Sequence, residues 1–241
     1  MLLSPYVTKH TLVPQCQIAT QPGVQGRDLL SLLAQVERWA ERTSTPLYIL
    51  QRDQKKGFDM LEPQGFYDAI IAYNLPTSII DLDKSSQENV PYHVKTAYGF
   101  TDPFMVNGVT KQGGSLSPLK CTLTTSLVNH WLTDLQNGRD GELVITSTNH
   151  ILGRPHTPSD DICLHVSMLE AMDDSLLLYS TMPLMIEMAR CADRFQATYG
   201  WETEWRKSAL YAYRSPEFPP DRPHDSTVSI PSMTPSGMMS L

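Results

Sequence analysis

Two aspartates, Asp173 and Asp174, stand side by side between apolar stretches at 162–172 and 175–179. Burying both carboxylates would be costly, because each would have to lose its hydration. A hairpin turn between two strands would leave them partly hydrated and direct them along one edge of a sheet. The pair is therefore a candidate for chemistry, and a simple polar turn is the alternative interpretation.

A third carboxylate, Asp53, ends an apolar run that is typical of a short strand over 47–53. Carboxylates on neighbouring strands repel each other unless a cation lies between them, and hard oxygen ligands suit Mg²⁺. Three of them could hold two ions ~3.5–4 Å apart, the arrangement used for in-line phosphoryl or nucleotidyl transfer. The other adjacent pair, Asp160 and Asp161, lies in a loop rich in proline and serine, and we predict that it stays outside such a cluster.

A glycine-rich segment at 108–114 precedes Ser117 and Pro118, a pair that is typical of a helix start. Backbone amides at the N-terminus of a helix favour a phosphate group. The segment is thus a second candidate element of a phosphate-handling site, with an ordinary glycine-rich turn as the alternative.

The elements that must position these residues follow a defined order. The pattern predicts a strand at 47–53, a long helix at 118–136, two short strands around Asp173 and Asp174, a helix at 184–199 and a strand at 208–213. This βαββαβ order is typical of the ferredoxin-like arrangement, an α+β fold whose antiparallel sheet is covered by two helices. The strand that ends at Asp53 would then lie beside the hairpin that carries the other two aspartates.

Further elements are expected on both sides of this core. Apolar positions at helical spacing predict a helix over 28–43, and Pro63 is well placed to open another helix. A β-hairpin is expected at about 90–107. From 214 to 241 the chain is rich in proline, serine and aspartate, which predicts a flexible tail.

Composition restricts the class of protein. The chain has 241 residues, of which 41% are hydrophobic, and its formal net charge is −7. No run of about 18 apolar residues is present, so no membrane span is expected. Four cysteines lie far apart in the sequence, which is typical of reduced thiols in an intracellular protein, cytoplasmic or nuclear. The acidic balance alone argues mildly against a free-standing nucleic-acid binder.

Five segments, in order, resemble the reverse transcriptase domain of non-LTR (LINE-type) retrotransposons over roughly residues 15–213. Residues 21–27 resemble the Q-x-G-F-x-x-G-R segment of the fingers, and residues 52–59 resemble motif A, whose first aspartate is Asp53. Residues 99–104 and 108–119 resemble motif B nearly residue for residue. Residues 171–174 occupy the place of motif C, and Phe195, Gly200, Lys207 and Ser208 resemble motif D.

The resemblance implies a polymerase palm with part of the fingers. It assigns 1–45 to a partial fingers segment, 46–213 to the palm, and 214–241 to a tail or the start of a thumb. Asp53 and Asp173 would ligate two Mg²⁺ ions, or Mn²⁺ in their place, with Asp174 assisting.

The resemblance also implies roles in handling the nucleotide. Phe58 would lie against the sugar and exclude a ribose 2′-OH, with an ordinary core aromatic as the alternative. Gln112 and Gly113 would line the nucleotide and template side of the pocket. Lys207 would donate a proton to the leaving pyrophosphate, with a solvated surface lysine as the alternative.

The implied activity is RNA-directed DNA polymerisation, in which a deoxynucleoside triphosphate is joined to a DNA primer 3′-OH on an RNA template. Fingers, thumb and endonuclease parts of a retroelement polyprotein would be further partners. Motif C begins with Ala171 where the family usually has an aromatic residue. Two alternatives stay open: a catalytically inactive or domesticated fragment that acts as an interaction module, and a metal-dependent phosphoesterase that uses the same carboxylates.

Overall fold

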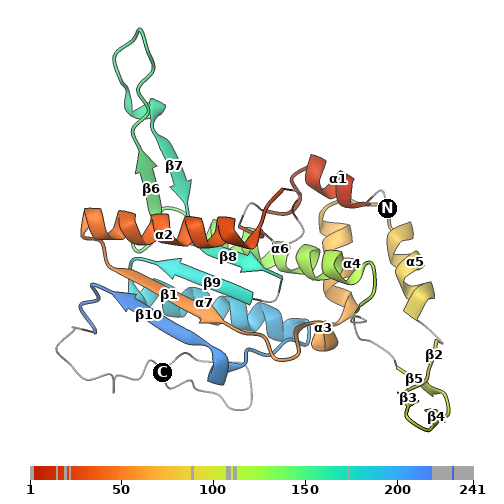
Figure 1. Cartoon of the computed structure of the whole chain (residues 1–241). Coiled ribbons are helices and arrows are strands. Elements are labelled where there is room, and N and C mark those ends of the chain that lie inside the picture. Colours follow the sequence, from red (N-terminus) through yellow and green to blue (C-terminus); the bar gives the residue numbers. More distant parts are fainter. Residues whose placement is uncertain are drawn as a thin grey trace.

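A four-stranded antiparallel sheet forms the centre of the protein in the computed structural model (Figure 1). The structure describes residues 3–14, 16–18, 21, 23–87, 90–106, 110, 113–172, 174–218 and 230. The strand order is β10-β1-β9-β8. The four strands are β1 (Leu47–Arg52), β8 (Met168–Ala171), β9 (Asp174–Tyr179) and β10 (Ala209–Tyr213).

This order confirms that the first strand lies beside the hairpin. β1 pairs antiparallel with β9 on one side and with β10 on the other, and β8 pairs antiparallel with β9. The predicted α+β class is confirmed as well, since the chain combines this antiparallel sheet with helices on its faces.

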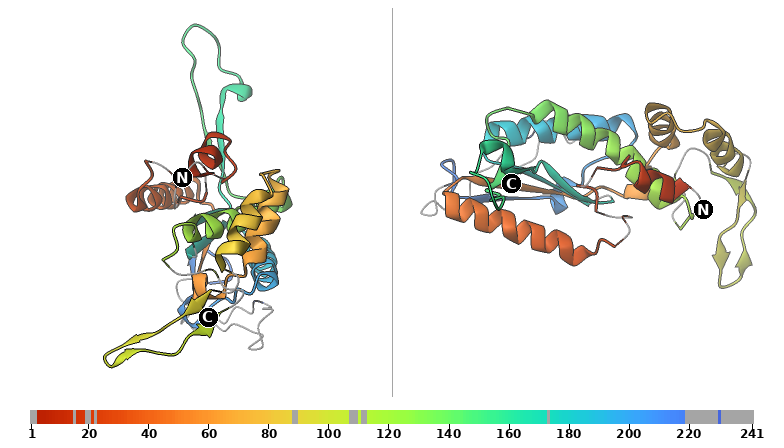
Figure 2. Two further views of the ribbon diagram at one scale, coloured as in Figure 1. Left: turned by 90° about the vertical axis from the view of Figure 1, so that its right-hand side faces the viewer. Right: turned by 90° about the horizontal axis from the view of Figure 1, so that it is seen from above.

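Alternate side chains of each strand pack on opposite faces of the sheet. Tyr48 and Leu50 of β1 enter a hydrophobic cluster with α6 (Ser117–Gln136) and α7 (Met182–Thr198). Leu47 and Ile49 enter a different cluster with α2 (Gly26–Thr43). The sheet therefore lies between α2 and the α6–α7 pair, as Figure 2 shows from above. The sequence predicted α2 as a helix but did not place it on the sheet.

Smaller helices extend the fold beyond the end of β1. The helix α4 (Pro63–Ala72) packs on α6 so closely that a Cβ on Gly65 would lie 2.5 Å from Cγ2 of Thr124. These helices are α1 (Leu3–Lys9), α3 (Gly57–Met60), α4 (Pro63–Ala72) and α5 (Ser78–Gln87). Two single-turn 3₁₀ helices, η1 (Pro158–Asp160) and η2 (Trp205–Lys207), complete the helical elements among the described residues.

Two hairpins project from this body (Figure 1). One comprises β2 (Pro91–Tyr92), β3 (Lys95–Thr96), β4 (Gly99–Phe100) and β5 (Phe104–Met105), close to the predicted 90–107. The other pairs β6 (Val144–Ser147) with β7 (Ile162–His165). The sequence pattern predicts one apolar stretch over 162–172 that leads to Asp173. In the structure only β8 of this stretch joins the central sheet.

Candidate active site

The register of the central sheet brings Asp53 and Asp174 to the same end. Arg52 lies opposite Ser175 in the antiparallel pair of β1 and β9. Asp53 follows Arg52 and Asp174 precedes Ser175, so the two aspartates occupy the next position of the register. Both also belong to the alternation that points towards the α2 face, as Ile49 and Leu178 do. The predicted neighbours are thus brought to one edge and one face.

The β8–β9 hairpin turns as tightly as a two-residue connection allows. Ala171 pairs with Asp174, so only Met172 and Asp173 link the strands. Met172 has a φ of 63°, which is the left-handed conformation that such short turns need and that side chains larger than glycine rarely adopt. Asp173, the predicted second metal ligand, lies outside the described residues.

Asp53 is held through its backbone while one of its carboxylate oxygens lacks a hydrogen bond. Its N–H donates to Oγ of Ser208 (3.3 Å), and its carbonyl accepts from the N–H of Glu204 (2.8 Å). Its Oδ2 is shielded from solvent and accepts no hydrogen bond from the described residues. The ammonium group of Lys207 lies 3.3 Å from this oxygen, on a side chain that is 72% exposed. The structure thus brings two predicted site residues together.

Phe58 lies just beyond Asp53, in the single turn of α3. The turn follows Lys56, which has a left-handed φ of 52°, and Trp201 fixes it by donating from Nε1 to the carbonyl of Gly57 (2.6 Å). Phe58 and Met172 both pack, half-buried, against the cluster of Leu61, Cys121 and Trp201. Phe58 therefore lies in the same small cluster as the turn of the aspartate hairpin.

Thr110, in the glycine-rich segment, lies close to the same region. The N–H of Thr110 donates to the carbonyl of Leu61 (3.1 Å), which joins this segment to the chain after Asp53. Gly113 is exposed with a φ of 80°, and among the described residues beyond its chain neighbours no atom lies within 4 Å of a Cβ placed on it. Gln112, the predicted nucleotide-binding partner, lies outside the described residues. The helix α6 then begins at Ser117, with Pro118 in its first turn as predicted.

A buried polar row that the sequence analysis did not single out lies behind the two aspartates. Glu170, Ser175 and Arg52 are opposite one another across β8, β9 and β1, and each is at most 2% exposed. Nη2 of Arg52 donates to Gln196 (2.5 Å) and Thr203 (2.8 Å). The sequence signal for this row is that Arg52 and Glu170 stand at strand positions where the alternation of the strand predicts a buried, apolar residue.

Burial shifts the pKa of both charged residues in this row, Glu170 and Arg52. Loss of hydration raises the pKa of Glu170 to about 7, although hydrogen bonds from Asn129 and Thr125 and the charge of Arg52 act in the opposite direction. The same loss of hydration lowers the pKa of Arg52. A carboxyl group that can change its protonation near neutral pH therefore lies one register position behind the candidate site.

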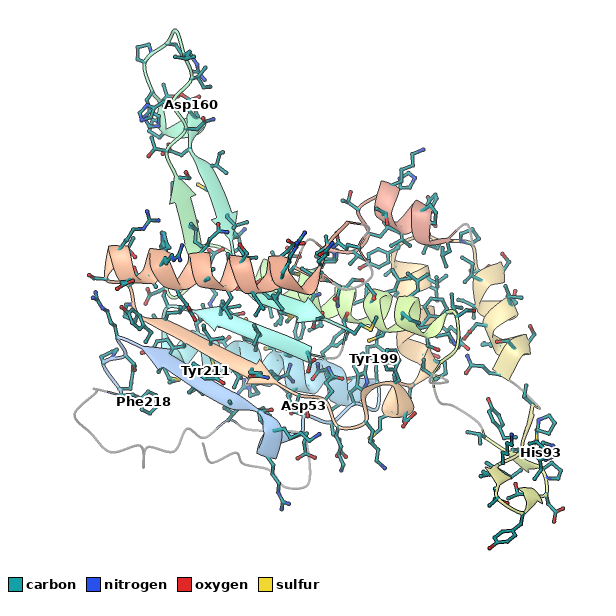
Figure 3. All side chains as sticks on the ribbon, viewed as in Figure 1. Asp53, His93, Asp160, Tyr199, Tyr211 and Phe218 are labelled. Carbon is teal, nitrogen blue, oxygen red and sulfur yellow. The ribbon has the colours of Figure 1, made fainter. Side chains whose placement is uncertain are left out.

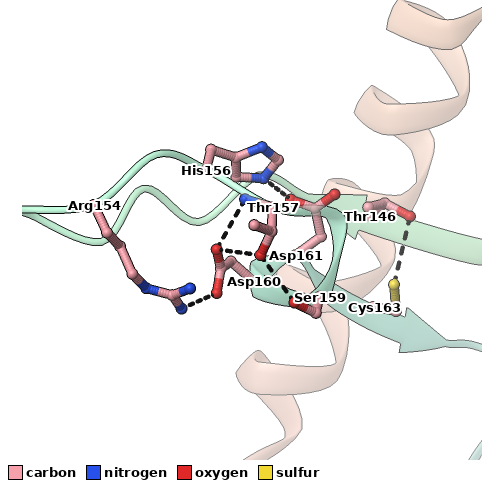
Figure 4. A network of polar contacts seen from close by, with 8 residues as sticks. All are labelled: Thr146, Arg154, His156, Thr157, Ser159, Asp160, Asp161 and Cys163. Atoms are coloured by element: carbon pink, nitrogen blue, oxygen red, sulfur yellow. Dashed lines mark hydrogen bonds and ion pairs between the residues drawn. The ribbon is translucent and has the colours of Figure 1, made fainter.

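The rival pair, Asp160 and Asp161, has a local structural role, as Figure 4 shows. Asp160 accepts hydrogen bonds from the N–H (2.9 Å) and Oγ1 (2.8 Å) of Thr157 and pairs with Arg154. Asp161 lies 2.7 Å from Nε2 of His156. Asp160 lies in the loop that joins β6 to β7, just before β7 and well away from Asp53 (Figure 3). The prediction that this pair stays outside the site is confirmed.

The residues present fit a hard divalent cation. The shielded Oδ2 of Asp53 is an oxygen of the kind that binds such a cation, and among the described residues only the nearby ammonium of Lys207 lies against it. Asp174 adds a second carboxylate at the same edge, and carboxylate oxygens suit Mg²⁺ or Mn²⁺. Within the described part of the chain no group of three or more acidic, histidine or cysteine side chains is placed to hold a metal. The third predicted ligand, Asp173, is outside that part.

Comparison with known proteins supports the fold. No protein-family model matches the sequence, and no curated protein matches it. Among solved structures, the chain is similar to apo telomerase from Candida tropicalis truncated from its C-terminal domain, with a TM-score of 0.60 and 15% identity over 90% of this chain and 41% of that one. Telomerase from the same organism in complex with a TWJ fragment of telomeric RNA gives 0.60 and 14%, over 88% and 34%.

A third similar structure is telomerase from Candida albicans with the same RNA fragment, at a TM-score of 0.56 and 14% identity over 87% of this chain and 33% of that one. This chain thus spans less than half the length of each of these telomerases. At such identities the similarity establishes the fold alone: this chain has the fold of the matching part of these telomerases. Among the described residues, no helix is both long and apolar enough to cross a membrane.

Proposed function

We propose that the chain is the palm, with part of the fingers, of an RNA-directed DNA polymerase of the retroelement type. The observation that carries the proposal is the placement of Asp53 and Asp174 at one end and on one face of the central sheet. The reaction is nucleotidyl transfer, in which a primer 3′-oxygen bonds to the α-phosphorus of a deoxynucleoside triphosphate and the bond to pyrophosphate breaks.

Each site residue has a defined task in this reaction. Asp53, Asp173 and Asp174 would hold the divalent cations, and the cations would supply Lewis acidity for the attacking and leaving oxygens. Lys207 lies beside Asp53 on an exposed side chain and donates a proton to the departing pyrophosphate. Phe58 would lie against the sugar C2′, and Gln112 and Gly113 would line the base and template side.

The RNA template and DNA primer are proposed partners. Two of the similar telomerases were solved in complex with a TWJ fragment of telomeric RNA, which supports RNA as a partner for a chain of this fold. The full reaction also requires the primer terminus to be held in line with the triphosphate, and such positioning contributes up to ~7–11 kcal/mol of the barrier reduction.

The test is addition of a single deoxynucleotide to a DNA primer on an RNA template, with the chain in excess at low salt so that weak binding does not limit the reaction. We expect slow addition with Mg²⁺ or Mn²⁺ that drops at least about 10³-fold in Asp53→Asn and in Asp174→Asn. Asp161→Asn is the matched control, because its carboxylate serves the β6–β7 loop. Equal rates in the chain and in Asp53→Asn would refute the proposal and favour the inactive interaction module.

A further inference from the structure

A segment near the N-terminus extends the central sheet beside the aspartate hairpin. Gln17 forms a parallel bridge with Glu170 of β8. The N–H of Glu170 donates to the carbonyl of Cys16 (2.8 Å), and the N–H of Ile18 donates to the carbonyl of Glu170 (2.9 Å). The segment is therefore fixed two residues from the turn at Met172, although it is 153 positions away from Glu170 in the sequence.

The side chain of Gln17 connects the turn to the buried polar row. Its Oε1 accepts a hydrogen bond from the N–H of Met172 (3.2 Å), and its Nε2 donates to Glu170 (2.9 Å) and Thr125 (3.1 Å). Gln17 is fully buried. The bonds to Glu170 and Thr125 are buried and the bond from Met172 is partly buried, so losing the Gln17 side chain would leave buried polar groups unpaired.

Glu170 is itself anchored from the opposite side. Nδ2 of Asn129, on α6, donates to the same Oε2 that accepts from Gln17 (2.9 Å). A continuous chain of hydrogen bonds thus runs from α6 through Glu170 and Gln17 to the backbone of Met172. Met172 holds a left-handed conformation that is intrinsically unfavourable for its side chain, and the next residue is Asp173.

We propose that Gln17 is a positioning residue of the candidate active site: its buried carboxamide fixes the turn that carries Asp173 and Asp174. The inference rests on the proposed function, since it concerns how the metal-holding carboxylates are oriented. Groups that orient metal ligands from behind typically change metal affinity 10–100-fold when they are removed.

The test compares Gln17→Met with Gln136→Met in the full chain. Gln136 is a matched control because it is also a fully buried glutamine, and its side-chain N and O have no hydrogen-bond partner among the described residues.

Two quantities are measured: amide hydrogen exchange at 168–174, and binding of Mn²⁺ followed by electron paramagnetic resonance. Gln17→Met should speed exchange at Met172 at least about tenfold and weaken Asp53-dependent Mn²⁺ binding about 10–100-fold. Gln136→Met should change neither.

A second pair of variants keeps the test decisive if Gln17→Met does not fold. Glu170→Leu removes the anchor of Gln17 and should reproduce both effects, whereas Glu170→Gln retains an acceptor and should preserve both properties. Unchanged exchange at Met172, or faster exchange with unchanged Mn²⁺ affinity, overturns the inference. If the unsubstituted chain binds no Mn²⁺ through Asp53, the proposed function fails and this inference fails with it, and that outcome is seen before any change at Gln17.

Discussion

Among individual residues, Phe58 offers the sharpest distinction between a functional and a purely structural role. Its ring lies in the small cluster beside the turn that carries the aspartates. If it meets the sugar, Phe58→Ala should raise the incorporation of ribonucleotides relative to deoxynucleotides by about tenfold or more, because space for a 2′-OH is created. The measurement is the ratio of single-nucleotide addition rates for the two sugars. Met60→Ala, in the same cluster, is the control. Unchanged selectivity in Phe58→Ala would show that Phe58 has only a structural role as a core aromatic residue.

Gly200 is a second residue with a consequence that can be measured. It ends α7 with a φ of 80°, and a Cβ on it would lie 2.8 Å from the carbonyl oxygen of Met60. Gly200→Ala should therefore lower the free energy of unfolding by about 2–4 kcal/mol, combining the cost of a left-handed alanine with a backbone clash.

The control for this prediction is Gly138→Ala. Gly138 has a φ of 71°, and no described residue beyond its chain neighbours has an atom within 4 Å of a Cβ built on it, so the substitution should cost only the ~1–2 kcal/mol of the backbone conformation. Urea denaturation of both variants gives the comparison. An equal loss of unfolding free energy in Gly200→Ala and Gly138→Ala would contradict the prediction, because it would show that the structure relieves the clash with Met60.

The sequence predicts those site residues that stand in a recognisable local pattern, and it misses those whose role depends on long-range contacts. Asp53 and Asp174 follow or begin strands whose apolar runs are plain, and adjacent aspartates in such a context are conspicuous. Lys207 was found only through its resemblance to a motif. Arg52 and Glu170 were missed because the alternation of a strand predicts apolar residues at buried positions, and only long-range contacts with α6, α7 and 16–18 make these charges tolerable.

Among the elements, the order of strands was predictable and the position of α2 was not. The order β10-β1-β9-β8 follows from the connectivity of a βαββαβ unit. The amphipathic pattern of α2 shows that one face is buried but not against which surface, and in the structure that surface is the sheet. Likewise, the run 162–172 divides at Val166–Ser167, because β7 pairs with β6 and leaves only β8 to the sheet.

The buried row of the central sheet should make stability depend on pH through Glu170. An ordinary glutamate titrates near 4.5, whereas burial raises the pKa of Glu170 to about 7 in the folded chain. Between these values the folded chain binds more protons than the unfolded one, so the free energy of unfolding should fall as the pH rises. This contribution is complete below about pH 4.5 and lost above about pH 7.

Urea denaturation at pH 5 and pH 8 checks this prediction. Glu170→Gln cannot titrate and should abolish on the order of 1–3 kcal/mol of the difference between the two pH values. The control is Glu187→Gln, which removes an exposed carboxylate paired with Arg139 and should leave the fall in stability in place. The same fall in Glu170→Gln and in the unsubstituted chain would contradict the raised pKa.

At the scale of the whole molecule, the net charge limits how the chain meets nucleic acid. A formal charge of −7 provides little long-range attraction for a polyanionic template. We therefore expect weak template binding that is lost steeply between 50 and 200 mM salt, and little processive synthesis by this chain alone. Fluorescence anisotropy with a labelled RNA–DNA hybrid measures the salt dependence. Tight binding that is insensitive to salt would show that the chain grips its substrate through contacts other than charge.

The most direct test of the central claim locates the cation itself. Iron(II) with ascorbate and peroxide produces hydroxyl radicals at a divalent site, and mass spectrometry identifies where the backbone is cut. The account predicts cuts near residue 53 and in the turn at 172–174, suppressed by excess Mg²⁺ and absent in Asp53→Asn. Cuts that persist unchanged in Asp53→Asn, or that fall elsewhere in the chain, would contradict a metal site at this end of the sheet.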